Sequence, residues 1–482
     1  MANALLPKSG GNHRDDAALL LEPRCALRRT IFTSRARQLV GLLMLVANSM
    51  VLTAGCAGPA LIYTLMPTPN LYARTPDNPF ADVPPALRTN TVDVLYVTDR
   101  EPEGDPAKDP QYGSRRSKSL AFGMAIVRIG KDVSWDDLVT ASRSAERHVS
   151  LPMSTVETRE MGRFPPVPTR EVERNGQFEE SPESVDARVT AEARLKALVA
   201  ERLGLSPKKE VYVFIHGVGS DFSEPTYVMA GLWHFMGRCG VPVAYTWPAG
   251  GGGGPLQGYN YDRESSEFTV FHLKQFLRLL ASCPGVEKVH ILAHSRGTDT
   301  AITALRELAI EVRASGGDTR KTLKIGCFVL AAADIDLEVS TQRISAERLM
   351  RVPEQMAMYV SPTDTTLGMA DWLFDSKQRL GESQEAGPLT RRRTELLQHL
   401  PDIQFIDVRV GGSGAGGHDY FYSHPGASSD LILLLRDNRR PGAENGRPLA
   451  REAGGLWRID PDYPATVQGA PGRPKLPTRQ TK

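Results

Sequence analysis

The chain has 482 residues, of which 41% are hydrophobic and 24% charged, and this composition predicts a globular protein with one large or two modest cores. The formal net charge is +2, but residues 1–38 carry seven Lys/Arg against three Asp/Glu, which leaves 51 basic and 53 acidic residues in the rest of the chain. That balance excludes the basic surface typical of a nucleic-acid-binding protein, so no nucleic-acid partner is expected.

The first predicted element is an export signal. Leu39–Ala54 is uncharged and mostly apolar, follows two arginines, and is shorter than the roughly 20 residues of a membrane-spanning helix. It runs into Ala54-Gly55-Cys56, which resembles the lipobox at which lipoprotein precursors are cleaved and lipidated. We therefore expect residues 1–56 to be a leader and Cys56 to carry lipid, which would anchor the protein on the periplasmic side of the cell envelope. An uncleaved N-terminal membrane anchor is the alternative.

Polar and β-rich segments follow the leader. Residues 57–90 contain many proline, asparagine and aspartate residues and are expected to form an extended tether. The runs Thr91–Thr98 and Ser119–Ile129 are rich in β-forming residues and predict an antiparallel pair of strands. The apolar residues of Ala187–Leu203 recur at helical spacing and predict a helix.

Short, nearly continuous apolar runs dominate the sequence after residue 210. Six of them predict strands: Val211–Ile215, Val241–Trp247, Lys288–Ala293, Ile325–Ala332, Met356–Val360 and Gln404–Val410. Three segments of helical spacing separate the earlier runs: Tyr227–Met236, Ser265–Leu280 and Thr298–Val312. This alternation predicts an α/β domain over residues 91–435, with a mainly parallel central sheet and helices on both faces. Residues 436–482 carry ten Lys/Arg and seven prolines and are predicted to be a disordered tail.

Ser295 lies where a predicted strand runs into a predicted helix. The surrounding residues Ala293-His294-Ser295-Arg296-Gly297 have the small-x-Ser-x-Gly pattern of a nucleophile elbow. In this turn small residues two before and two after the serine allow strand and helix to approach closely. The pattern predicts that Ser295 is a catalytic nucleophile.

A serine that transfers acyl groups needs backbone N–H donors for the oxyanion. The turn His216-Gly217-Val218-Gly219 follows the first strand of the alternating block, and we expect the N–H of Val218 to be one donor. The N–H of Arg296, directly after the nucleophile, is expected to be the second. His216, Gly217 and His294 are expected to line the substrate site.

The acid and the base are expected after later strands. Asp364 follows the strand Met356–Val360 and is preferred as the acid, with Asp334, which follows the preceding strand, as the alternative. His418 comes after the last strand and a glycine-rich loop and is the expected general base. His424, the competing histidine, precedes Pro425 and an apolar helix, which is typical of a residue at a helix entry.

Metal ions and cofactors are not expected. After Cys56 the only cysteines are Cys239, Cys283 and Cys327, and their spacing matches neither a disulfide framework nor a metal clip. The glycine run 250–254 lacks the Gly-Lys-Ser/Thr of a phosphate-binding loop and is expected to be a flexible loop at the rim of the site.

With these residues placed, the chain resembles bacterial α/β-hydrolases of the DUF900 group, esterase/lipase-like proteins that are often exported lipoproteins. The resemblance extends from about Thr91 to Leu435. It is carried by Val94–Arg100, His216-Gly217, Tyr245–Pro248, Tyr261–Ser265, Ala293–Gly297, Asp334–Asp336 and Gly417–Phe421. The glycine run after Pro248 and the long C-terminal segment depart from the pattern.

The resemblance implies an α/β-hydrolase fold and a serine hydrolase mechanism. The expected reaction is cleavage of a small carboxylic ester by Ser295, His418 and Asp364 through an acyl-enzyme. Thioester or peptide cleavage would use the same groups and is an alternative. A catalytically inactive binding module of the cell envelope on the same scaffold is another. The sequence does not predict an oligomeric state.

Overall fold

The computed structural model describes residues 62–74, 77–104, 110–362, 364, 403–409, 417–452 and 455–464, all of which belong to one compact unit that begins at Ile62. The predicted leader, with Cys56, lies outside these residues. Within the described ranges no helix combines the length and the apolar character needed to span a membrane.

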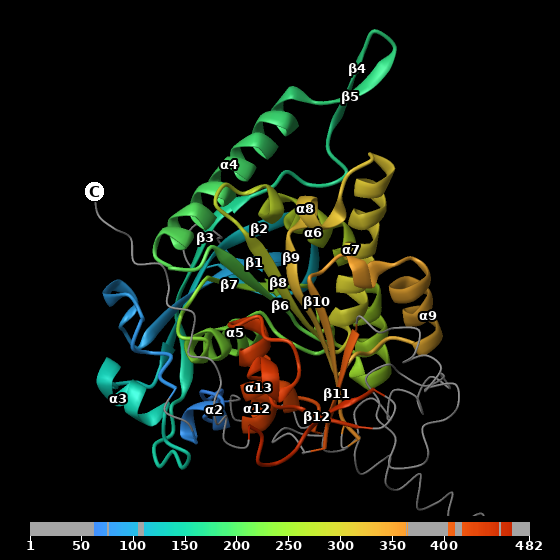
Figure 1. Ribbon diagram of the computed structural model, residues 1–482. Coiled ribbons are helices and arrows are strands. Elements are labelled where there is room, and N and C mark those ends of the chain that lie inside the picture. The colour runs from blue at the N-terminus through green and yellow to red at the C-terminus, as the bar shows by residue number, and fades with distance from the viewer. Residues whose placement is uncertain are drawn as a thin grey trace, which may run out of the picture. The chain divides into compact units, whose positions relative to one another are not determined.

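The core of the fold is an 11-stranded sheet (Figure 1) with the strand order β12-β13-β11-β10-β9-β8-β6-β7-β1-β2-β3. The six predicted strands of the alternating block are confirmed and pair in parallel: β6 (Glu210–Ile215), β7 (Val241–Thr246), β8 (Lys288–His294), β9 (Ile325–Ala331), β10 (Gln355–Val360) and β11 (Ile403–Val408). The predicted antiparallel pair is also present as β1 (Thr91–Glu103) and β2 (Gln111–Ile129). The register Leu95↔Val243 joins β1 to β7 in parallel, which connects the antiparallel strands to the parallel part.

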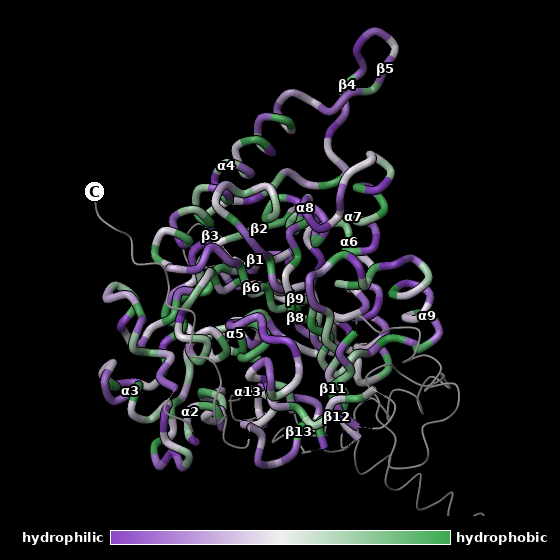
Figure 2. The backbone as a smooth tube through the Cα atoms, in the orientation of Figure 1, coloured by the Kyte–Doolittle hydropathy of each residue, from purple (hydrophilic) through white to green (hydrophobic). Residues whose placement is uncertain are grey.

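Both faces of the parallel strands are buried. In β6, Val211, Val213 and Ile215 pack in one apolar cluster, whereas Tyr212 and Phe214 pack in another on the opposite face. Figure 2 shows the hydrophobic residues gathered along these central strands. Burial on both faces explains why the strand sequences are continuously apolar rather than alternating.

Helices cover the two faces of the sheet. The cluster around Val213 includes residues of α4 (Pro182–Gly204), α6 (Gly254–Ser282) and α7 (Gly297–Ala314), and the cluster around Phe214 includes residues of α5 (Ser223–Phe235) and α13 (Pro425–Leu435). The predicted helices in α4, α5, α6 and α7 are thus confirmed, with α6 beginning eleven residues before the predicted Ser265.

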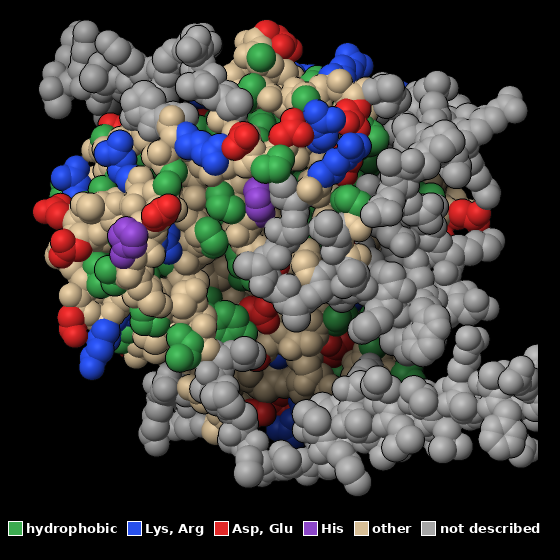
Figure 3. All heavy atoms as spheres, turned by 90° about the horizontal axis from the view of Figure 1, so that it is seen from below, with side chains coloured by type: hydrophobic (Ala, Val, Ile, Leu, Met, Phe, Trp, Pro, Cys, Tyr) green, Lys and Arg blue, Asp and Glu red, His purple; other side chains and the backbone are tan. Residues whose placement is uncertain are grey.

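The remaining elements are short or lie at the sheet edges. The antiparallel β3 (Met153–Arg163) pairs with β2, and the hairpin β4 (Glu171–Arg174) and β5 (Gln177–Glu180) projects at the top of Figure 1. The others are α2 (Asn70–Ala73), η1 (Pro85–Leu87), α3 (Trp135–Ala141), α8 (Thr319–Leu323), α9 (Leu337–Thr341), η2 (Gln342–Ala346), η3 (Leu349–Arg351), α12 (Tyr420–Ser423), η5 (Ala443–Asn445), β12 (Ala450–Arg451) and β13 (Trp457–Ile459). On the face seen in Figure 3, acidic and basic side chains of the described residues lie interspersed.

The prediction of an extended tether over residues 57–90 is wrong for the part that the structure describes. The amide of Leu65 donates to Leu151 O at 2.8 Å, and the amide of Met153 donates to Tyr63 O at 2.7 Å, so this segment is bonded to the folded domain. Leu71, Phe80 and other apolar side chains between the prolines are buried. Their burial stabilises the segment on the domain, which composition alone did not indicate.

The prediction of a disordered tail over residues 436–482 is wrong as far as Pro464. The segment adds β13 to the sheet beside β11, and its Arg447 forms an ion pair of 2.6 Å with Asp430 in which both side chains are fully buried. Arg436 donates to Tyr72 Oη at 2.8 Å and thereby joins the two segments that flank the predicted domain. Residues 465–482 lie outside the described ranges. The folded domain therefore extends beyond 91–435 at both ends.

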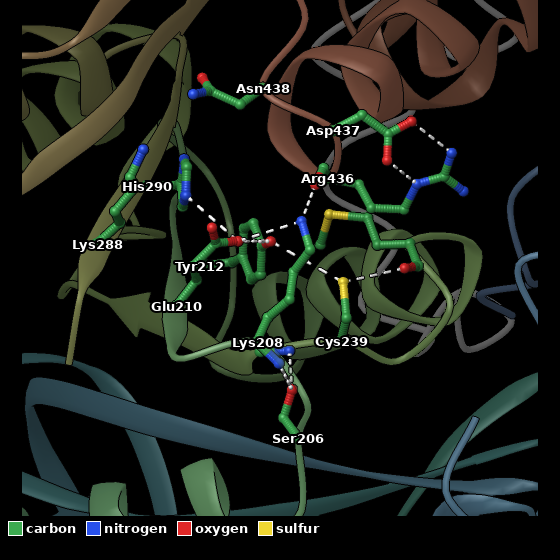
Figure 4. A network of polar contacts seen from close by, with 12 residues as sticks. Ser206, Lys208, Glu210, Tyr212, Cys239, Lys288, His290, Arg436, Asp437 and Asn438 are labelled. Atoms are coloured by element: carbon green, nitrogen blue, oxygen red, sulfur yellow. Dashed lines mark hydrogen bonds and ion pairs between the residues drawn. The ribbon is translucent and has the colours of Figure 1, made fainter. Parts of the chain in front are cut away.

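A polar cluster beside β6 and β8 includes the buried His290 (Figure 4). The imidazole ring stacks on Tyr212 with centroids 5.0 Å apart, and Nδ1 accepts a hydrogen bond from the amide of Cys327 at 3.1 Å. Burial lowers the pKa of His290 to about 4, with Lys208 and Lys288 acting in the same direction and Glu210 opposing them. The folded protein therefore holds this histidine neutral.

His290 is expected to make the stability of the fold depend on pH. The unfolded chain takes up a proton at this histidine below its ordinary pKa of about 6.5, whereas the folded protein does so only near pH 4. The contribution of neutral His290 to the free energy of unfolding is thus fully present above about pH 6.5. It is lost as the pH falls toward 4, at roughly 1.4 kcal/mol per pH unit. In urea unfolding, His290→Asn is expected to be less stable than wild type at neutral pH, with the difference shrinking as the pH falls. The exposed His148→Asn is the control, and an unchanging difference for His290→Asn would contradict the expectation.

Candidate active site

Ser295 lies in a strained turn between β8 and α7. Its φ is +51°, in the left-handed region that residues other than glycine rarely adopt, at a typical cost of about 1 kcal/mol or more. Gly297 makes the turn possible, because a Cβ atom there would lie 2.3 Å from His216 O. Ala293, at the other small position of the pattern, is fully buried. The predicted nucleophile elbow is therefore present in its geometry.

Backbone bonds hold the turn against the neighbouring strand. The amide of Ser295 donates to Ala331 O at 3.0 Å, at the end of β9. The carbonyl of Ser295 accepts from the hydroxyl of Thr298 at 2.7 Å and from the amide of Asp334 at 3.3 Å. These bonds fix the serine at the carboxyl edge of the sheet, where ligands of open α/β sheets bind.

The loop after β6 approaches the serine closely at Gly217. A Cβ atom on Gly217 would lie 3.0 Å from Ser295 Oγ and 2.6 Å from its Cβ, so only glycine fits without movement. His216 stacks on Trp247 with ring centroids 5.0 Å apart, and Trp247 Nε1 donates to His216 O at 2.7 Å. Burial lowers the pKa of His216 well below its ordinary value, so this ring is neutral. His216 and Gly217 thus shape the loop beside Ser295, and their contact with substrate stays a prediction.

His418 and Asp364 lie together. Nδ1 of His418 is 2.7 Å from Asp364 Oδ2, and the Asp364 side chain is fully buried. Nε2 of His418 is also buried and makes no hydrogen bond to any residue in the described ranges, Ser295 included. Hydrogen bonds between a nucleophile and its base are often long in unliganded hydrolases and tighten when substrate binds. The contact with Asp364 leaves Nε2 as the ring nitrogen able to exchange a proton with a substrate.

The two alternative residues have other partners. Asp334 Oδ2 accepts from Tyr259 Oη at 2.7 Å. His424 is the N-cap of α13, where its Nδ1 accepts from the amide of Gly426 at 3.1 Å, so the expected helix-entry position is confirmed. Among the predicted acids and bases, the structure brings together Asp364 and His418.

His294 lies between the elbow and the loop of His418. Its Nε2 is 3.2 Å from the carbonyl oxygen of His418, and the two imidazole centroids are 4.7 Å apart. Burial lowers the pKa of His294 well below its ordinary value, with His418 acting in the same direction. The neutral ring must therefore donate its Nε2–H to that carbonyl. This contact ties the residue before the nucleophile to His418.

The side chain of Arg296 lies behind the elbow rather than in the open. Its guanidinium forms a 2.7 Å ion pair with Asp299 and reaches Asp334 O at 3.4 Å. The backbone of Arg296 is the N-cap of α7, so its N–H has no acceptor within that helix. Whether this N–H and that of Val218 bind an oxyanion stays a prediction.

Tyr420 holds the loop of His418 in place and was not singled out as a site residue from the sequence. Its hydroxyl donates to Tyr359 O at 2.7 Å and accepts from the amide of Ala332 at 3.1 Å, so it bridges the ends of β9 and β10. The position lies in the Gly417–Phe421 segment that carried the family resemblance, two residues after His418. That spacing was the only signal in the sequence.

In the described part of the chain, no group of three or more His, Cys, Asp or Glu side chains could hold a metal ion. Cys239, Cys283 and Cys327 are free and buried. Burial raises the pKa of the Cys283 thiol to about 11 and that of Cys327 to about 12, so both are protonated near neutral pH.

Two solved structures are similar to this chain at low sequence identity. One is a predicted CIB-like hydrolase from Thermoplasma acidophilum, with 12% identity, a TM-score of 0.28, and coverage of 47% of this chain and 86% of that one. The other is Est1E from Butyrivibrio proteoclasticus with bound ferulic acid, with 10% identity, a TM-score of 0.27, and coverage of 47% and 89%. No match was found among curated proteins. At these TM-scores neither structure assigns roles to residues here.

Residues 191–436 match the family described as an alpha/beta hydrolase of unknown function, DUF900. The matched region begins in α4 and ends after α13, so it contains the elbow, Asp364 and His418. It covers more than half of the 482 residues, and the parallel sheet with helices on both faces agrees with the family's description. The chain belongs to the DUF900 family of α/β-hydrolases.

Proposed function

We propose that this protein is a serine hydrolase that cleaves carboxylic esters. The observation that carries the proposal is the 2.7 Å contact of His418 Nδ1 with buried Asp364. It leaves Nε2 of His418, which has no partner among the described residues, free to act as a base. The strained φ of Ser295 at the elbow supports its role as nucleophile. Membership in an α/β-hydrolase family supports the same reaction class.

In the proposed mechanism Ser295 Oγ attacks the ester carbonyl while His418 Nε2 takes its proton. Asp364 accepts the Nδ1–H bond and stabilises the imidazolium that forms. The N–H groups of Val218 and Arg296 bind the oxyanion of the tetrahedral intermediate. His418 then protonates the leaving alcohol, which gives an acyl-enzyme on Ser295. Water, deprotonated by the same histidine, releases the acid and restores the serine.

The proposed substrates are esters of short to medium acyl length. Residues 381–388, between the acid and the strand before the base, have the sequence GESQEAGP, which lacks the large apolar side chains of a lipase lid. The triad alone does not select among esters, thioesters and peptides, because the same attack on a carbonyl serves all three.

A substrate panel tests this proposal. We expect p-nitrophenyl acetate and butyrate to be hydrolysed with kcat/KM at least about tenfold higher than the palmitate ester, because a longer chain needs an apolar surface to bind. An acyl-CoA and a peptide p-nitroanilide, assayed beside the esters, test the alternatives. A preference for palmitate, for the thioester or for the peptide would overturn the proposed substrate class.

We propose in addition that the protein is a lipoprotein attached to the cell envelope through Cys56. The support is the sequence alone: an uncharged apolar run that follows two arginines and leads into Gly55-Cys56. Cells fed labelled palmitate should incorporate the label into this protein, and Cys56→Ala should abolish the incorporation. The variant Cys25→Ala, in the leader, is the control and should keep the label. Recovery of the protein with an intact Met1 would contradict the proposal.

A further inference from the structure

Two loops meet beside the predicted oxyanion donor. The loop after β6 contains Gly219 and Ser220, and the loop after β7 contains Gly250. A Cβ atom on Gly250 would lie 3.3 Å from Ser220 O and 3.6 Å from Gly219 O, so the two backbones approach each other closely. Gly219 and Gly250 have φ values of +75° and +84°, which glycine adopts without strain. The conformation of one loop therefore constrains the other.

A buried carboxylate binds the N–H groups of both loops. Asp262, in the third turn of α6, is 2% exposed. Its Oδ2 accepts from the amide of Gly219 at 2.7 Å, and its Oδ1 accepts from the amides of Gly250 at 2.9 Å and Gly251 at 3.2 Å. Hydrogen bonds to an ionised acceptor are roughly twice as strong as neutral ones. Asp262 thus joins the loop after β6, residues 216–220, which we call the oxyanion loop, to the glycine run and to α6.

A buried guanidinium binds the carbonyl groups of the same two loops. Arg100, at the end of the parallel part of β1, is 1% exposed. Its Nη2 donates to Ser220 O at 2.7 Å and its Nη1 donates to Ala249 O at 3.0 Å. Further bonds run from Nη1 to Gly113 O at 2.9 Å and from Nε to Thr246 Oγ1 at 2.9 Å. Burial lowers the pKa of Arg100 to about 10, so the side chain remains charged near neutral pH.

We infer that Asp262 and Arg100 are positioning residues that fix the oxyanion loop, an inference that rests on the proposed function. Val218 lies between Gly217 and Gly219. A Cβ atom on Gly217 would be 3.0 Å from Ser295 Oγ, and the amide of Gly219 donates to Asp262. The Asp262 and Arg100 contacts fix the backbone on the C-terminal side of Val218, and the close approach of Gly217 to the elbow fixes it on the other. The orientation of the Val218 N–H follows from both.

This arrangement predicts an effect on the transition state rather than on substrate binding. A donor aimed in advance at the oxyanion needs no reorganisation when charge develops there. The carbonyl of the bound ester carries little of that charge, so a loosened loop lowers kcat and leaves KM nearly unchanged. The glycine run, expected from the sequence to be a flexible rim, is at Gly250 and Gly251 part of this fixed structure.

Asp262→Asn is the decisive variant. Asparagine has the same size, but its NH₂ group would face one of the three N–H donors and leave a buried donor unpaired. Arg100→Lys tests the role of the guanidinium. It keeps the positive charge, but an ammonium group cannot make all four hydrogen bonds of Arg100. Glu264→Gln, which removes an exposed carboxylate two residues further along α6, is the matched control.

The measurement is kcat and KM for p-nitrophenyl butyrate, with active sites counted by titration with a fluorophosphonate. Counting active sites means that a variant of which only a fraction folds is still assessed per folded molecule. We expect kcat per titrated site to fall about 10- to 100-fold in Asp262→Asn and Arg100→Lys, less than for complete removal of a donor, with KM within about threefold. The inhibition constant of phenylboronic acid, which forms a tetrahedral adduct on the serine, should rise by a similar factor. Glu264→Gln should match wild type.

The failures of the two proposals are distinguishable. If the wild type is active and both variants keep kcat per titrated site within twofold, the inference about Asp262 and Arg100 is overturned and the proposed function stands. The same holds if the variants only reduce the number of titrated sites, since that is a purely structural role. A wild type that neither hydrolyses the ester nor reacts with the fluorophosphonate overturns the proposed function and the inference with it.

Discussion

Replacing Ser295 by alanine is expected to lower kcat for p-nitrophenyl butyrate by on the order of 10⁵-fold or more. The rate that remains would come from substrate binding and the oxyanion site alone. Ser295 is the residue at the elbow, where its backbone is strained at a φ of +51°. Its hydroxyl lies beside Gly217, where a Cβ atom would be 3.0 Å from Oγ. Without the hydroxyl, His418 has no nucleophile to deprotonate. The substitution should lower kcat and leave KM nearly unchanged, because the groups that bind the ester are the same in the variant.

Fluorophosphonate labelling measures the same residue directly. Wild type should be labelled and Ser295→Ala should not, while Ser282→Ala, an exposed serine at the end of α6, should label as wild type does. Alanine has about the same conformational strain as serine at a positive φ, so the thermal midpoint of unfolding should change little. Labelling that persists in Ser295→Ala would show that another residue is the nucleophile.

The strands and the elbow could be predicted because their determinants are local. The strands of the parallel block are buried on both faces, so Val211–Ile215 and its counterparts are continuously apolar and stand out from their surroundings. The elbow is equally local, since Ala293, Ser295 and Gly297 act within five residues of one another. The predicted order of nucleophile, acid and base rests on the order of the strands that precede these residues.

The flanking segments could not be predicted because their partners are far away in the sequence. The amide of Leu71 donates to Ser429 Oγ, 358 positions away, and Arg436 donates to Tyr72, 364 positions away. Composition measures only the segment itself, and prolines, arginines and aspartates gave both flanking segments the character of a linker. Their few apolar side chains are buried by the rest of the domain.

Asp262 was missed for a related reason. In the sequence it stands just before the predicted helix start at Ser265, where a carboxylate ordinarily interacts with the helix N-terminus. Because α6 begins at Gly254, Asp262 is instead an interior residue of the helix that faces two loops from other strands. The position of a helix end thus decided whether the same residue looked like a cap or like part of the site.

Substitutions of Asp364 and of Asp334 are expected to have very different effects on kcat, although the two aspartates have similar positions. Asp364 and Asp334 both follow a strand at the carboxyl edge of the sheet and both are buried, at 5% and 2% exposure. Asp364 is 2.7 Å from His418 Nδ1, whereas Asp334 accepts a hydrogen bond from the hydroxyl of Tyr259 at 2.7 Å. Only a carboxylate at Nδ1 can hold the imidazole in the tautomer that leaves Nε2 unprotonated and can stabilise the imidazolium.

Asp364→Asn should therefore lower kcat by about 10³- to 10⁴-fold, because the amide NH₂ facing Nδ1 favours the tautomer with the proton on Nε2. Asp334→Asn keeps an oxygen for the Tyr259 hydroxyl and retains the backbone amide that donates to Ser295 O, so its kcat should fall less than about tenfold. Both constants are to be measured per fluorophosphonate-titrated site, with circular dichroism as a check on folding. The reverse result, a nearly inactive Asp334→Asn beside an active Asp364→Asn, would mean that His418 takes its orientation from Asp334 during turnover. Such an exchange of partners would require His418 to leave Asp364, and the two variants distinguish that case from the 2.7 Å contact between these two side chains.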